Sequence, residues 1–324
     1  MNFFQIISEI EKVDPEVYDR LDSRRSIFKN MAGLGQKLSA AALPLAVGAI
    51  FNKVYAQTPV GADVNAVLNF ALKLEYLESY FYNAATAVTG LSAVNQAALA
   101  LIRTDEANHV SFLRTTITAL GGTPIAVPAT TGVFDFTGGG RFNPTDATTY
   151  LALAQSLEDT GVRAYKGAAP LVMANKTVLT AALNIHSVEA RHASQLRAMR
   201  RAGNNSSTPS QGVAVAPYSG LTGAPKSWIS GTDGGGAIPT ASAIRGFSTA
   251  GIYGAGNQTN APATIIFAAE DSVSQANVTL SATTLTATAG FPAASYSEAF
   301  DEGLDVGTVA AIANNFSVTG TYFN

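Results

Sequence analysis

The feature that most constrains this chain is a nine-residue block that occurs twice. Residues 106–114 and residues 189–197 share the pattern Glu-Ala-x-His-x-Ser-x-Leu-Arg, so six of the nine positions are identical. The two copies lie 83 residues apart. An internal repeat at a fixed offset indicates that one structural unit occurs twice in the fold.

A second pair of landmarks keeps the same offset. Glu75 is followed seven residues later by Tyr82, and Glu158 is followed seven residues later by Tyr165. Residues 61–202 therefore read as two copies of one helix pair. The first helix of each pair contributes a single Glu, and the second contributes a Glu-x-x-His.

The apolar pattern supports this interpretation. Apolar residues recur every three or four positions at residues 62–87, which predicts a helix with one apolar stripe. Three more helices are predicted, at residues 92–120, 145–174 and 177–202, with Pro170 kinking or shortening the last turn of the third. The connection between the second and third helices is long for a helix bundle and rich in Gly, Thr and Pro. Such a crossover lets these two helices run parallel.

Residues three apart on a helix share a face, so each Glu-x-x-His directs a carboxylate and an imidazole the same way. Four helices with these faces inward bring together four Glu and two His. This set resembles the ligands of the ferritin-like superfamily, whose helix bundles hold two iron or manganese ions between carboxylates. Within that superfamily the chain is most similar to bacterial ferritin-like proteins of the desiccation-related group. The resemblance implies an all-α, ferritin-like four-helix bundle at residues 57–203.

The resemblance also implies a dimetal site with six ligands. They are Glu75, Glu106, His109, Glu158, Glu189 and His192. In the predicted arrangement Glu106 and Glu189 bridge two ions, and one remaining Glu–His pair completes each side. Oxygen-rich ligands with one imidazole per ion suit iron or manganese better than zinc. The alternative is a buried polar cluster without metal, which would leave several carboxylates uncompensated in the core.

Two tyrosines and an aspartate are candidates for supporting this site. Tyr82 and Tyr165 could hydrogen-bond the carboxylates or carry an electron; alternatively they are core aromatic residues with a satisfied hydroxyl. Asp105 stands where dimetal enzymes of this type orient a ligand histidine from the opposite helix pair. The equivalent residue in the second copy is Val188, so this outer layer of support is incomplete.

Four further polar residues are expected outside the ligand set. His186 lies one turn before Glu189, and we expect a core histidine or a contact to a ligand rather than a third imidazole ligand. Glu78 is expected to be a rim or surface carboxylate, because its equivalent in the second copy is a glycine. Arg114 and Arg197 are expected to be surface or end-of-bundle charges.

The composition excludes several classes of function. The chain has no Cys, which removes disulfides, thiolate metal sites and cysteine nucleophiles. The formal net charge is −3, which gives no electrostatic reason to expect a nucleic acid as partner. Of the three His in the chain, two lie in the repeated block.

Residues 1–56 read as a leader or as an N-terminal helix. The stretch at residues 23–29 resembles a twin-arginine export motif, an apolar run follows at residues 38–51, and Ala56 closes a small-residue cleavage pattern. The run is too short and interrupted for a transmembrane helix, which needs about 20 apolar residues. We expect a periplasmic or exported protein whose membrane contact is confined to this segment. The alternative is an uncleaved helix that packs on the bundle of a cytoplasmic protein.

The composition changes again in residues 204–324. Only nine charged residues remain there, and Gly, Ser, Thr and Ala dominate. Short strands are predicted at residues 263–267 and 278–285, followed by a terminal helix capped by Asp305. We expect this loop-rich extension to pack back on the bundle. Alternatively, it binds an envelope protein or a second copy of the chain.

The resemblance implies an oxidoreductase of the ferroxidase, peroxidase or catalase-like type, acting in oxidative or desiccation stress. Its small-molecule partners would be O₂ or H₂O₂, together with Fe(II) in the ferroxidase case. The alternative is a non-catalytic metal-binding protein with a structural or stress-protection role in the cell envelope.

Overall fold

The computed structural model describes residues 63–129, 132–202, 229, 250–253, 267–268, 272–275, 278–279 and 300–324, and they are mostly helical. The chain divides into two units. The larger comprises residues 57–273 and 294–324, and the smaller comprises residues 1–56 and 274–293. The predicted leader lies outside the described residues.

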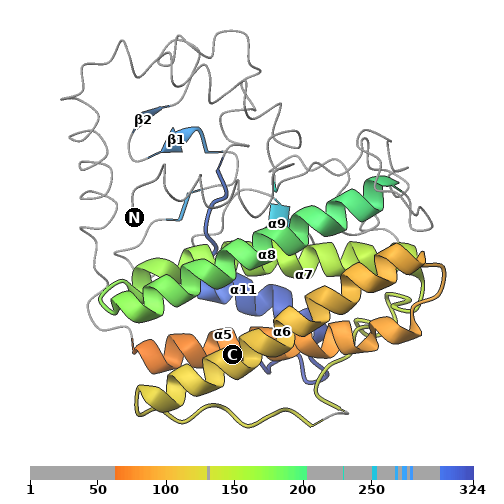
Figure 1. Ribbon diagram of the computed structural model, residues 1–324. Helices are drawn as coiled ribbons and strands as arrows, with labels where there is room; N and C mark the ends of the chain where they lie inside the picture. Colours follow the sequence, from red (N-terminus) through yellow and green to blue (C-terminus); the bar gives the residue numbers. More distant parts are fainter. Residues whose placement is uncertain are drawn as a thin grey trace, which may run out of the picture. The chain divides into compact units, whose positions relative to one another are not determined.

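Four long helices make up most of the described residues of the larger unit (Figure 1). They are α5 (Val64–Asn83), α6 (Ala93–Ala119), α7 (Ala147–Val172) and α8 (Lys176–Ala202), and a short 3₁₀ helix, η1 (Ala84–Ala87), follows α5. Helix α5 packs mainly on α6, and α7 packs mainly on α8. The two pairs meet where α5 contacts α7 and where α6 contacts α8. The helices begin and end within a few residues of the predicted positions.

Each long helix is preceded by an N-cap residue whose side chain accepts a hydrogen bond from a backbone N–H of the first turn. The accepting residues are Asp63, Ser92, Asp146 and Asn175, at distances of 2.9, 3.2, 2.9 and 3.1 Å. Such N-caps satisfy backbone donors that have no partner within the helix, and each is worth about 1 kcal/mol. Local sequence therefore sets where these helices start.

The connection between α6 and α7 runs back along the helices, so both helices begin at the same end (Figure 1). It is held against α5 by polar contacts. The Tyr80 hydroxyl donates to Pro128 O at 2.7 Å, and Ile125 N donates to Asn69 Oδ1 at 2.8 Å. The connection is thus part of the packed domain rather than a free loop.

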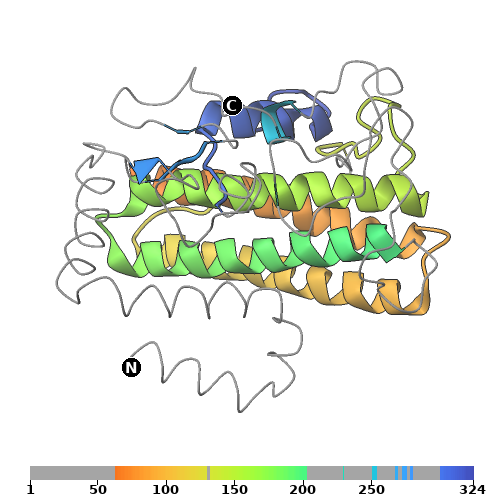
Figure 2. The same cartoon turned by 90° about the horizontal axis from the view of Figure 1, so that it is seen from above.

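A C-terminal helix, α11 (Val306–Ala313), covers one side of the four helices. Figure 2 shows it on the side of α5 and α7 that faces away from α6 and α8. Its N-cap is Asp305, as predicted, which accepts from Thr308 N at 3.0 Å. Helix α9 (Ala250–Tyr253) contacts α7 and α11, and η3 (Asn314–Phe316) follows α11.

The segment before α11 lies directly against α7. Leu304 N donates to Arg163 O at 3.0 Å, and the buried Arg163 guanidinium donates to Glu302 O at 2.9 Å. A Cβ atom at Gly167 would lie 2.0 Å from Leu304 O, so only glycine permits this approach. The end of the extension that the structure describes therefore packs on the helical domain.

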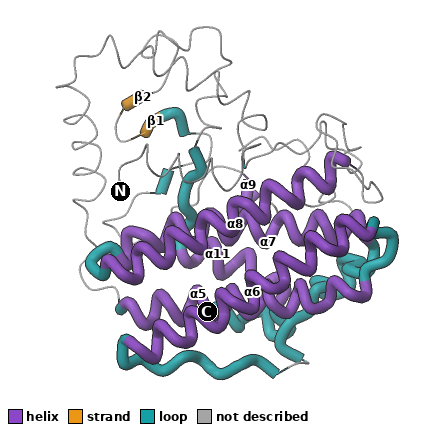
Figure 3. The backbone as a smooth tube through the Cα atoms, in the orientation of Figure 1, coloured by secondary structure: helices purple, strands orange, loops and turns teal. Residues whose placement is uncertain are grey.

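Strand structure in the described residues is limited to one short pair (Figure 3). Strands β1 (Ser274–Gln275) and β2 (Val278–Thr279) are antiparallel, with Ser274 opposite Thr279. Most of the predicted strands at residues 263–267 and 278–285 lie outside the described residues, so they stay a prediction. Among the helices of the described part, none is long and apolar enough to cross a membrane.

Candidate metal centre

The six predicted ligands lie inside the helical domain, on four different helices. Helix α5 carries Glu75, α6 carries Glu106 and His109, α7 carries Glu158, and α8 carries Glu189 and His192. The four glutamates are fully buried, and the two histidines are 7% and 6% exposed. Four carboxylates and two imidazoles thus share a core that is otherwise largely apolar.

These residues form two overlapping groups, each with one ligand atom per residue within 4.8 Å of the others. The first group contains Glu75, Glu106, His109 and Glu189, and the second contains Glu106, Glu158, Glu189 and His192. Glu106 and Glu189 belong to both groups. Their position is the one that bridging carboxylates between two ions would need.

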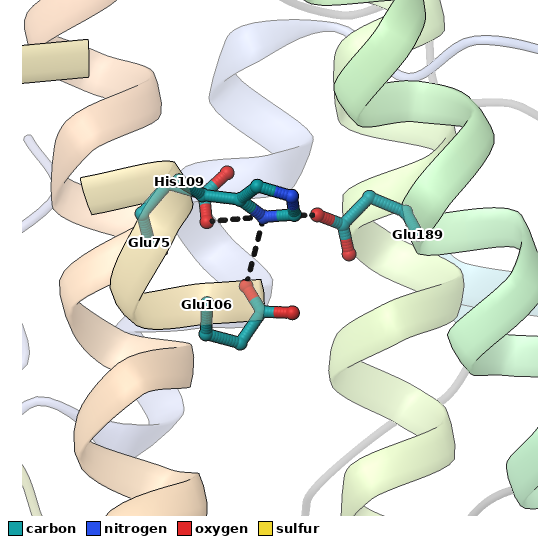
Figure 4. A group of neighbouring side chains, drawn as sticks. All are labelled: Glu75, Glu106, His109 and Glu189. Atoms are coloured by element: carbon teal, nitrogen blue, oxygen red, sulfur yellow. Dashed lines mark hydrogen bonds and ion pairs between the residues drawn. The ribbon is translucent and has the colours of Figure 1, made fainter. Parts of the chain in front are cut away.

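The first group is arranged around one imidazole nitrogen (Figure 4). His109 Nδ1 lies 3.2 Å from Glu75 Oε2, 3.2 Å from Glu106 Oε2 and 3.3 Å from Glu189 Oε1. A single ring nitrogen carries at most one hydrogen, so it cannot satisfy three carboxylates from three helices. A cation at this point could contact all of them.

The imidazole of the second group, His192, has a carboxylate beside each of its ring nitrogens. His192 Nδ1 lies 2.9 Å from Glu106 Oε1 and 3.2 Å from Glu158 Oε2, while Nε2 lies 3.1 Å from Asp105 Oδ2. When Nε2–H donates to Asp105, Nδ1 presents its lone pair to the carboxylates, as a metal ligand requires. Position 188 is the equivalent of position 105 in the second copy of the repeat. It carries a valine, which cannot accept such a hydrogen bond, so the two positions differ in function.

His109 instead lines a groove between α6 and α8. The groove has a volume of about 710 Å³, and His109 and Val188 are both in its wall. Phe112, which is 44% exposed, also lines it. Small molecules could approach the first group from this side.

The two predicted tyrosines contact ligands across the repeat. The Tyr82 hydroxyl donates to Glu158 Oε1 at 2.5 Å, and the Tyr165 hydroxyl donates to Glu75 Oε1. Each tyrosine therefore holds the carboxylate of the other half. Burial raises the pKa of both phenols well above the usual range, so they remain donors.

Burial and mutual charge govern the protonation of the group. Burial raises the pKa of Glu75 to about 8 and that of Glu158 well above its usual range. Burial opposes ionisation of Glu106 as well, but contacts with His109 and His192 lower its pKa to about 2. Burial disfavours charge on His192, yet the carboxylates around it raise its pKa to about 12. Without a cation, the cluster depends on protons for its charge balance.

Several of these polar atoms have no hydrogen bond although they are buried. They are Glu106 Oε1, Glu158 Oε2, Glu189 Oε1, Glu189 Oε2 and His192 Nδ1. Some lie near one another without the alignment that a hydrogen bond needs. Each unsatisfied buried group costs about 1–3 kcal/mol, so their convergence here calls for a further partner. Four carboxylates and two neutral imidazoles would balance two divalent cations, and the residues present therefore fit a dimetal site.

Four other polar residues were expected outside the ligand set, and the structure places each of them. His186 Nδ1 lies 2.9 Å from Val162 O and belongs to neither group. The prediction for Glu78 was wrong, because its side chain is buried, with only 4% exposed. The glycine at the equivalent position, Gly161, could have indicated this burial. Because Gly161 has no side chain, it leaves room for the side chain of Glu78 from the facing helix.

The prediction for Arg197 was also wrong, because it is fully buried. Its guanidinium lies 2.5 Å from Asp159 Oδ2, so the charge is paired inside the domain. Arg114 is half-buried and donates to the Tyr76 hydroxyl at 2.6 Å. Tyr76 and Asp159 are 83 residues apart, so both arginines reach the equivalent position of the preceding helix.

Comparison with known families bears on this part of the chain. The family model described as the ferritin-like domain matches residues 63–202, which run from the N-cap of α5 to the end of α8. A search of curated proteins gives no match to the chain.

Proposed function

We propose that residues 63–202, which match the model of the ferritin-like domain, bind two iron or manganese ions and that the protein uses them to react with O₂ or H₂O₂. The observation that carries the proposal is the pair of overlapping groups with Glu106 and Glu189 in common. Both groups combine buried carboxylates with one imidazole, which is the donor set these two metals favour. We take α5–α8 to be the four-helix bundle typical of such sites.

Each ligand has a role on this proposal. Glu75, Glu106, His109 and Glu189 would hold one ion, and Glu106, Glu158, Glu189 and His192 would hold the other, so Glu106 and Glu189 would serve both. Bound iron or manganese would supply the exchange of electrons with O₂ or H₂O₂.

Residues around the six ligands hold them in position. Tyr82 and Tyr165 fix the two terminal carboxylates, and Asp105 fixes the imidazole of His192. The apolar core around the ligands excludes bulk water. The groove beside His109 gives O₂, H₂O₂ or Fe(II) a route to the centre.

One observation favours a second candidate, a metal-binding protein without turnover. Val188 stands where an acceptor for His109 would be needed, so that imidazole lacks the support that Asp105 gives His192. Partners in the outer layer of a metal site tune both affinity and reactivity. A metal centre in which only one histidine has such an acceptor would suit a stress or envelope protein whose bound metals stabilise the fold without turnover.

Metal loading followed by turnover separates these candidates. The full chain is loaded anaerobically with Fe(II), or separately with Mn(II), and the bound metal is counted by elemental analysis. Consumption of H₂O₂ and oxidation of Fe(II) are then measured for the wild type, Glu106→Ala, Glu189→Ala and His186→Gln. The last variant changes a histidine on the same helix that lies outside both groups.

We expect two ions per chain and turnover in the wild type and in His186→Gln, with both lost in the two glutamate variants. Two bound ions without turnover would favour the second candidate. If the wild type binds no iron or manganese, the proposal is wrong.

A further inference from the structure

Glu78 is a buried carboxylate that the six-ligand arrangement does not use. It lies on α5 one turn after Glu75 and is 4% exposed. It has no hydrogen bond or ion pair with any residue in the described part of the chain. The charged groups that act on it most strongly are all carboxylates, of Glu189, Glu106, Glu158 and Glu75. Such a group needs a cation or a proton to remain in the core.

The carboxylates of Glu78 and Glu189 both lie close to Gly161. A Cβ atom at Gly161 would lie 3.4 Å from Glu78 Oε1 and 3.1 Å from Glu189 Oε2. The two carboxylates therefore border the same small space beside α7. Both oxygens of Glu189 are buried and lack a hydrogen bond.

This space exists because the repeat is broken at one position. Gly161 lies 83 residues after Glu78, so the first half carries a carboxylate where the second half carries none. A Cβ atom at position 161 would crowd Glu189 and would be in ordinary contact with Glu78. The pair Glu78 and Gly161 thus makes the two sides of the centre chemically different.

The space beside Glu78 is small. A cavity of only about 10 Å³ adjoins Glu78 and Gly161, and Ile312 and Ala313 of α11 are among the residues that line it. That volume suffices for about one water molecule. No substrate-sized molecule fits there, so on this side Glu78 can meet at most a water, and the larger candidate partner is the centre itself.

We propose that Glu78 is a fifth carboxylate ligand of the dimetal centre, and that its charge stabilises a trivalent ion. The inference rests on the proposed function. Four carboxylates balance two divalent ions, whereas a fifth leaves one negative charge that a single M(III) would neutralise. Glu78 should therefore make reduction of the centre harder.

A reductive titration of the iron-loaded full chain tests this inference. Dithionite supplies the electrons, each reducing one Fe(III) to Fe(II), and the potential is followed with redox dyes by visible absorption. The wild type is compared with Glu78→Gln, which removes the charge at nearly constant shape, and Glu78→Asp, which keeps the charge. Circular dichroism and the iron content of each variant are recorded first.

We expect a more positive reduction potential in Glu78→Gln and a potential closer to the wild type in Glu78→Asp. A folded Glu78→Gln variant that loses one of two irons would also support a ligand role. Equal potentials and equal iron content in wild type and Glu78→Gln would overturn the inference while leaving the dimetal proposal intact. A wild type without iron would instead overturn the proposed function, and this inference with it.

Discussion

At the scale of single residues, the centre is not symmetric although the repeat that encodes it is. His192 is held by Asp105, whereas His109 faces a groove beside Val188. Glu78 adds a carboxylate on one side, and Gly161 adds none on the other. Replacements at a few positions therefore distinguish two groups of side chains that the repeat would otherwise make alike.

The contact between Asp105 and His192 should contribute to metal affinity. We expect Asp105→Asn to weaken binding of one ion by about 10–100-fold, because the imidazole loses its charged acceptor. The measurement is a competition titration with a coloured chelator. Val188→Asp is the matched variant, since it offers an acceptor near His109 and should strengthen binding. Equal affinity in wild type and Asp105→Asn would contradict the role given to this contact.

The protonation of the buried carboxylates predicts how the stability of metal-free protein depends on pH. The pKa of Glu75 is raised from 4.5 to about 8 on folding. Between these values the folded state binds more protons than the unfolded state, so the free energy of unfolding falls as pH rises. The raised pKa of His192 acts in the same direction above pH 6.5. Glu106, whose pKa is lowered from 4.5, gives the opposite slope only below that value.

Urea unfolding of EDTA-treated protein between about pH 5 and pH 8 measures this dependence. Each proton held only by the folded state contributes a slope of about 1.4 kcal/mol per pH unit. Glu75→Gln should flatten the curve, since it removes one of these protons. A free energy of unfolding that is constant or increases over the range would show that the carboxylates are not buried as described.

At the scale of elements, the 83-residue repeat is seen in the bounds of the helices and in the contacts between them, and not only in the sequence motif. Helices α6 and α8 begin and end 83 residues apart, and α5 and α7 begin at the same offset. The tyrosine of each half reaches the terminal carboxylate of the other half. The two halves are thus tied together at the centre itself.

Periodicity and spacing predicted the four helices, the six clustered side chains and the N-cap of α11. They did not predict that Glu78 and Arg197 are buried, because burial of a charge depends on a partner from another helix. For Arg197 that partner is Asp159, whereas Glu78 is accommodated because Gly161 on the facing helix has no side chain. Nor could local sequence indicate that residues 300–304 lie against α7, a contact between segments distant in the chain.

The close approach of the C-terminal segment to α7 should depend on glycine. We expect Gly167→Ala to destabilise the protein by about 1–3 kcal/mol, because the added Cβ would overlap Leu304 O. Urea unfolding measures this change. Gly251→Ala is the control, since a Cβ there meets only Ile312 and Thr308 side chains at 3.5–3.6 Å. A similar stability for Gly167→Ala and wild type would show that residues 303–304 do not pack as described.

At the scale of the whole molecule, the N-terminal segment predicts export. Its twin-arginine-like motif and its small-residue pattern at Ala56 predict cleavage before Gln57. N-terminal sequencing of protein from the native host should therefore give a start at Gln57. A mature chain that retains residues 23–29 would instead indicate an uncleaved N-terminal segment.

The account depends most on two cations between Glu106 and Glu189. Crystals of the full chain loaded with iron or manganese can be measured at the absorption edge of that metal, where anomalous scattering locates each ion. We predict two peaks per chain, one beside His109 and one beside His192, with the two glutamates between them. An anomalous map without peaks inside the helical domain, or with peaks only at its surface, would contradict the central claim.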